Sequence, residues 1–155
     1  MNSRFEKAKN TALFMFEDEP SKKNFFTDIV SSVSRAKFSP LAEDPYIFSR
    51  DYLAVHVWDI RNTRTPARSF NVTDYLEKRL CEVYESEAIF DKFDMQVSPD
   101  ASMVVTGGYN SQAHIIDLVS QSNSTVDIKF MDKRGKNVGS QRGYRGRRLQ
   151  QSMNS

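Results

Sequence analysis

Residues 53–59 carry apolar side chains at successive positions. In an extended chain, neighbouring side chains point to opposite faces, so Val55 and Val57 share one face while Ala54 and Trp58 share the other. Because neither face is polar enough to meet water, the pattern predicts a β-strand that is covered on both sides.

The same pattern recurs later in the chain. Residues 112–118 repeat residues 54–60 with a shift of 58 positions, and residues 97–99 echo residues 38–40 with a shift of 59. The residues that we expect at equivalent structural positions of this repeat are His56, Trp58, Asp59, His114 and Asp117. Two strand clusters at one period, the first ending in Trp-Asp, are typical of a WD-repeat β-propeller. The predicted fold class is therefore all-β.

Alternating apolar residues and turn residues predict four short strands in each copy of the repeat. The predicted strands are residues 34–39, 46–48, 53–59 and 67–72 in the first copy, and 89–97, 102–106, 112–117 and 125–130 in the second. A closed ring needs about four to eight blades of roughly 40–45 residues each. The 155 residues therefore predict a propeller fragment over 1–131, with about two blades and part of a third. We place blade A at 33–72 and blade B at 89–130.

A helical pattern over residues 73–88 interrupts the repeat. Thr73 can cap a helix, and the apolar residues that follow it at helical spacing are Leu76, Leu80, Val83 and Tyr84. In repeat folds such insertions gather on one face, which is often the binding face. The segment before blade A occupies the equivalent place, so we expect Phe25 and Phe26 on the same face as residues 84–92. On sequence alone, this phenylalanine pair is either a recognition patch or a loop folded onto the core.

The charge distribution is uneven although the net charge is only +2. Residues 1–118 hold 14 basic and 18 acidic residues, whereas residues 119–155 hold 8 basic and 2 acidic residues. We expect residues 132–155 to form a basic, disordered tail. Its arginine and glycine residues leave RNA binding open beside the simpler interpretation of a solvated tail.

Cysteine content and hydropathy indicate a cellular compartment. Cys81 is the only cysteine, which excludes an internal disulfide and suits a reducing compartment. No apolar run approaches the ~20 residues that cross a bilayer, so a membrane is not an expected partner. We expect a cytoplasmic protein, with the nucleus as a further location.

No constellation of residues predicts catalysis. His56 and His114 occupy equivalent repeat positions, which a structural role explains without a metal ion. No nucleophile elbow and no complete kinase signature is present. We therefore predict a non-enzymatic protein without cofactor or metal, and the repeat favours a protein-binding surface.

Several motifs resemble one family. They are residues 25–34, 37–39, 50–53, 57–59, 75–76, 80–81, 84–85, 89–93, 106–107 and 109–110. In this order they closely resemble the B-type, WD-repeat regulatory subunit of protein phosphatase 2A, over roughly residues 1–118. The resemblance implies part of a seven-bladed propeller that docks on the phosphatase scaffold (A) subunit, lies next to the catalytic (C) subunit and recruits phosphoprotein substrates.

The resemblance also implies a substrate-binding surface. The positions that match it here are Phe25, Phe26, Tyr84, Glu85, Phe90 and Lys92. The aromatic residues would act as anchors, and the two charged residues would select the charge pattern of the substrate. The alternatives are a general WD-repeat interaction scaffold and RNA binding through the tail; nucleic acid is the less favoured partner.

Overall fold

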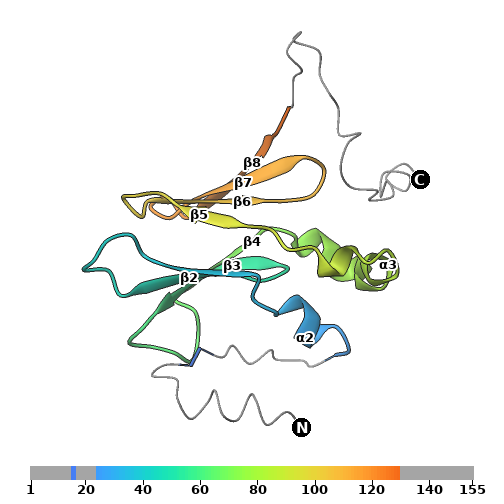
Figure 1. Ribbon diagram of the computed structural model, residues 1–155, viewed down its shortest axis with the longest axis horizontal. Coiled ribbons are helices and arrows are strands. Elements are labelled where there is room, and N and C mark those ends of the chain that lie inside the picture. The colour runs from blue at the N-terminus through green and yellow to red at the C-terminus, as the bar shows by residue number, and fades with distance from the viewer. Residues whose placement is uncertain (1–14, 17–23, 130–155) are drawn as a thin grey trace.

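A computed structural model describes residues 15–16 and 24–129 of the chain. They form two four-stranded antiparallel sheets that lie face to face, with short helices gathered at one end (Figure 1). Sheet A contains β1 (Arg35–Phe38), β2 (Tyr46–Arg50), β3 (Ala54–Asp59) and β4 (Arg68–Asn71) in that order. Sheet B contains β5 (Met95–Val97), β6 (Met103–Gly107), β7 (Gln112–Asp117) and β8 (Ser122–Asp127).

The main hydrophobic core lies between the two sheets. Its buried residues are Phe48, Val55, Val57, Phe70, Val72, Met95, Val104, Ile116 and Leu118. On the opposite face of sheet A, Trp58 is only 6% exposed, and the ring of Phe16 meets it edge-on with 5.5 Å between ring centroids. Strand β3 is therefore covered on both sides, as its two apolar faces predicted.

The strand register shows that the sheets are copies of one unit. His56 pairs with Ser69 on the fourth strand of sheet A, and His114 pairs with Thr125 on the fourth strand of sheet B. Contacts also link positions that are one repeat apart: the first strands of the sheets are joined by Arg35–Asp94 and Lys37–Gln96, each at 2.6 Å. Two equivalent four-stranded units side by side confirm the predicted partial propeller.

Two predicted strands of blade B are wrong in their bounds. The strand expected over residues 89–97 begins only at Met95, because Ile89 belongs to the short 3₁₀ helix η2 (Ala88–Phe90). There its side chain is 2% exposed and packs with the helical insertion, which overrides its preference for a strand. The last strand was predicted over 125–130 but lies at Ser122–Asp127. As an edge strand it pairs through its backbone and needs no apolar side chains.

The helical insertion packs as a second, smaller core. It contains the 3₁₀ helix η1 (Asp74–Arg79), α3 (Leu80–Glu85) and η2, and α2 (Thr27–Val30) lies against it. The buried residues of this core are Tyr52, Leu76, Leu80, Val83 and Ile89. Figure 1 shows α2 and α3 at the same end of the two sheets.

Thr73 is not the helix cap that its position predicted. It makes no side-chain cap hydrogen bond; instead its hydroxyl donates to the backbone oxygen of Tyr52, and its backbone N–H donates to Leu53. Thr73 is fully buried, so it ties the insertion to the turn before β3.

The basic segment 132–155 lies outside the described residues, as does most of the segment before blade A, where the predicted part of a third blade would lie. Within the described part of the chain, no helix has the length and hydropathy to span a membrane.

Candidate functional site

Four aromatic rings form one cluster at the helical end of the molecule; three are exposed and Phe26 is half-buried. Tyr84 lies at its centre, with ring centroids 5.6 Å from Phe25, 5.8 Å from Phe26 and 5.9 Å from Phe90. The rings meet edge-on or tilted, which is the favourable geometry for aromatic pairs. Phe25 is 70% exposed, Phe90 55% and Tyr84 39%. We call these four residues the aromatic cluster.

Phe25, Tyr84 and Phe90 are the exposed members of the cluster, whereas Phe26 is half-buried and packs against the second core. In α3, Val83 packs inward and leaves Tyr84 at the surface; in η2, Ile89 does the same for Phe90. The turn that carries the phenylalanines is fixed by Asn24, whose Oδ1 accepts the Phe26 N–H at 2.8 Å and whose own N–H donates to Thr27 Oγ1 at 2.7 Å. The cluster is thus a supported surface of three elements.

The two charged residues predicted for this surface are both exposed. Glu85 follows Tyr84 directly at the end of α3, and Lys92 comes two residues after Phe90. Neither makes a salt bridge within the described residues. The structure therefore brings all six predicted residues to one end of the molecule, and their role in binding stays a prediction.

A pair of tyrosines beneath the cluster was missed by the sequence analysis. The hydroxyl of Tyr109 donates to the backbone oxygen of Ala88 at 2.6 Å. The hydroxyl of Tyr52 lies 3.2 Å from the hydroxyl of Tyr109. Burial raises the pKa of both phenols, so both hydroxyls stay protonated. Their positions in the sequence could have indicated that they are equivalent, because each tyrosine lies a few residues before the third strand of its blade. Tyr109 in blade B thereby holds η2, which carries Phe90.

A groove adjoins the aromatic cluster between α2 and the start of α3. Its volume is about 330 Å³. Its lining residues are Asn24, Thr27, Val30, Ser31, Asp51, Leu53, Glu77 and Leu80. We call it the acidic groove, because its two ionisable residues are both carboxylic acids.

The histidines of the repeat make hydrogen bonds within their own blades. His56 lies 2.8 Å from both Ser69 Oγ and Asp51 Oδ2. His114 Nδ1 lies 3.4 Å from Thr125 Oγ1. Burial, with a smaller effect of the Arg50 cation, lowers the pKa of His114. No group of three potential metal ligands occurs among the described residues.

The other repeat residues also make local contacts. The indole N–H of Trp58 donates to Ser49 Oγ on β2 at 2.9 Å. Hydrogen bonds from Arg61 lower the pKa of Asp59 to about 2, and the backbone N–H groups of Ser120 and Val119 lower that of Asp117. These contacts all lie within one blade, so the repeat residues stabilise their own sheets.

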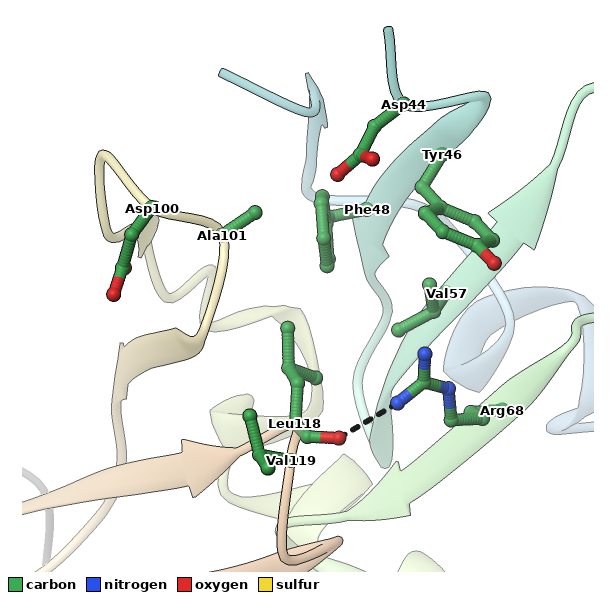
Figure 2. A pocket seen from close by; sticks show the side chains of 9 residues that line it. All are labelled: Asp44, Tyr46, Phe48, Val57, Arg68, Asp100, Ala101, Leu118 and Val119. Carbon is green, nitrogen blue, oxygen red and sulfur yellow. Dashed lines mark hydrogen bonds between the residues drawn. The ribbon is translucent and has the colours of Figure 1, made fainter. Parts of the chain in front are cut away.

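A second groove opens between the sheets at the end opposite the helices (Figure 2). It has a volume of about 180 Å³, and Phe48, Val57 and Leu118 are among its apolar lining residues. Arg68 crosses it and donates to the backbone oxygen of Leu118 at 2.7 Å. This volume is below the range of about 300–1,000 Å³ that is typical of ligand pockets, so the helical end is the better candidate site.

The sequence of the chain is similar to those of several known proteins. No family model matches the chain. The phr2AB regulatory subunit of serine/threonine-protein phosphatase 2A from Dictyostelium discoideum is 40% identical over 111 residues, which are 72% of this chain and 22% of the relative. The gamma isoform of the 55 kDa B-type regulatory subunit from Rattus norvegicus is 39% identical over 119 residues, 77% of this chain and 26% of the relative. The B-type regulatory subunit of protein phosphatase 2A from Candida tropicalis is 46% identical over 100 residues, 63% of this chain and 19% of the relative.

The chain is a homologue of the B-type regulatory subunits of protein phosphatase 2A. It spans only 19–26% of the length of these three relatives, so it corresponds to part of a B-type subunit. The relatives are regulatory and not catalytic subunits, and this agrees with the prediction of a protein that is not an enzyme.

Proposed function

We propose that this part of a B-type subunit serves a protein phosphatase 2A holoenzyme by selecting its substrates through the aromatic cluster. The proposed partners are the scaffold and catalytic subunits and phosphoprotein substrates. The observation that carries the proposal is a cluster of four contacting aromatic rings, three of them exposed, on a chain homologous to phosphatase regulatory subunits. We extend the proposal to a cytoplasmic or nuclear location, where such substrates would be met.

The chemistry of the cluster suits protein recognition. Binding energy at interfaces concentrates in a few aromatic and arginine side chains that are desolvated on binding. Phe25 and Phe90 are more than half exposed, as expected of an apolar patch that binds another protein. Glu85 and Lys92 at its margin would favour partners of complementary charge pattern.

The binding surface can be tested by selecting a random displayed peptide library on the purified full-length chain. The wild-type protein is expected to enrich a family of peptides with apolar side chains, and Tyr84→Ala is expected to abolish that enrichment. Tyr75→Ala is the matched control, because Tyr75 is an exposed tyrosine of η1 outside the cluster. Enrichment that survives Tyr84→Ala would exclude the cluster as the binding site.

The phosphatase partners need a separate experiment. Purified scaffold and catalytic subunits are mixed with the full-length chain and analysed by size-exclusion chromatography. We expect one complex containing the three proteins, and we expect Tyr84→Ala to leave it intact. If peptides bind but no complex forms, the proposed scaffold and catalytic partners of this chain are wrong, and the alternative of a general interaction surface is favoured.

A further inference from the structure

A hydroxyl residue is followed directly by proline at three places in the chain: Ser39, Thr65 and Ser98. Each lies in a connection between two strands of the same sheet. Proline lacks a backbone N–H and keeps the residue before it extended. An enzyme that modifies such a hydroxyl can therefore select for the proline. The structure shows which of the three hydroxyls such an enzyme could reach.

The two serine hydroxyls are used within their own turns. Ser39 Oγ donates to Asp44 Oδ2 at 3.0 Å. Ser98 Oγ donates to Asp100 Oδ1 at 2.6 Å and accepts the backbone N–H of Met103 at 2.9 Å. Both serines are half-buried, and their backbone N–H groups donate across their hairpins. An enzyme would have to break these hydrogen bonds before it could reach either hydroxyl.

Thr65 is presented in a different way, on the exposed loop between β3 and β4. Its side chain is exposed, and neither its hydroxyl nor its backbone N–H makes a hydrogen bond to another described residue. The loop is held at its two ends, where Asn62 N–H donates to the backbone oxygen of Asp59 at 2.9 Å and Ala67 N–H to that of Val57 at 2.8 Å. A loop tip with so few hydrogen bonds extends into an enzyme cleft at little cost.

Positive charge also distinguishes the threonine from the two serines. Arg64 precedes Thr65 directly and Arg68 follows it by three positions, whereas no lysine or arginine occurs within three residues after Ser39 or Ser98. Arg64 is exposed and makes no salt bridge within the described part of the chain. Basic residues beside the hydroxyl favour an enzyme whose substrate cleft is acidic.

We propose that Thr65 is a phosphorylation site for a proline-directed protein kinase that prefers basic residues beside its target. The kinase transfers the γ-phosphoryl group of ATP: a bond forms between phosphorus and Thr65 Oγ1, the bond to the β–γ bridging oxygen breaks, ADP leaves, and a base of the kinase takes the hydroxyl proton. The phosphate brings a charge of about −1.5 to −2 next to the unpaired Arg64, so the loop can accept it without like-charge repulsion.

This inference goes beyond the proposed function and does not depend on it. Arg68 begins β4 and lines the second groove, at the end of the sheets opposite the helices (Figure 1). The loop that carries Thr65 leads directly into this strand. The modified residue therefore lies away from the aromatic cluster.

The test incubates the purified full-length chain with a purified cyclin-dependent kinase and ATP and maps the phosphate by tandem mass spectrometry. We expect phosphate on Thr65, and we expect Thr65→Val and Pro66→Ala each to abolish that modification. Thr63→Val is the matched control, because Thr63 belongs to the same loop and is not followed by proline. Absence of phosphate at Thr65, or undiminished incorporation into Thr65→Val, would overturn the proposal.

A rate comparison tests the part played by the fold. Thr65 in the folded chain is expected to be phosphorylated within about threefold of the rate for a synthetic peptide of residues 59–71, because opening of an exposed loop costs little. A rate more than about tenfold slower in the chain would show that the fold hides the threonine, which would contradict the inference.

Tyr84→Ala separates the inference from the proposed function. This variant is expected to be phosphorylated at Thr65 as fast as the wild type, whether or not it still selects peptides. Slower phosphorylation of Tyr84→Ala would place a kinase contact at the helical end and would argue against recognition through the loop alone. Circular dichroism of each variant establishes that the fold is retained.

Discussion

His114 shows how the environment of one residue decides its chemistry. It lies on the face of β7 that packs against sheet A and is 8% exposed. Gly108 leaves room for its ring: a Cβ at Gly108 would lie 2.9 Å from His114 Nε2. Burial, and secondarily the Arg50 cation, lowers the pKa of His114, so the folded state disfavours the protonated ring.

This depressed pKa predicts a loss of stability in acid. Above the unfolded-state pKa of about 6.5, both states hold neutral histidine; below it the unfolded chain binds the proton first, so the free energy of unfolding falls. The fall continues until the pH reaches the lower pKa of the folded state. Urea unfolding of wild type and His114→Gln between about pH 7.5 and 5.5 should show a flatter pH dependence for the variant. Equal slopes would show that His114 is not the titrating group.

Strands are predictable from the sequence where side-chain periodicity decides the structure. The strand predicted over 112–117 matches β7, in which burial alternates: His114 and Ile116 are buried, and the residues between and beside them are only partly buried. Periodicity could not place η2, since Ile89 and Phe90 satisfy a strand pattern equally well, and only packing against the insertion selects a 3₁₀ turn.

The candidate site was predicted only in part for the same reason. The common face of residues 25–26 and 84–92 follows from where propeller connections gather. The acidic groove and the tyrosine pair depend on the approach of residues distant in sequence, such as Tyr109 and Ala88, for which the chain carries no local pattern.

Tyr109→Phe tests how η2 is held. The variant keeps the ring that meets Phe93 at 5.0 Å but removes the hydrogen bond to Ala88. We expect a loss of about 1 kcal/mol in the free energy of unfolding and faster hydrogen exchange of the Phe90 and Asp91 amides, which donate within η2 and its C-terminal cap. Tyr52→Phe is the control, because its hydroxyl makes no bond to η2. Similar exchange in both variants would argue that Tyr109 does not hold η2.

For the whole molecule, the question is what holds the two sheets together. Polar links join the first strands, but Arg35 and Asp94 have side chains 49% and 56% exposed. Exposed ion pairs contribute about 0–1 kcal/mol and are screened by salt. Truncating a buried side chain between the sheets lowers the free energy of unfolding far more, by about 2–5 kcal/mol for isoleucine to alanine. The two sheets are therefore held together mainly by the apolar core between them.

Ile116→Ala and Asp94→Asn separate these two contributions. Ile116 is fully buried at the junction of the sheets, so its truncation should lower the free energy of unfolding by about 2–5 kcal/mol, with little dependence on salt. Asp94→Asn should cost much less than this truncation, and its cost should disappear at high salt. Denaturant unfolding at low and high salt measures both. If Asp94→Asn were the more damaging change, the sheets would be held by the charged strands and not by the core, and an isolated pair of blades would then depend on ionic strength for its assembly.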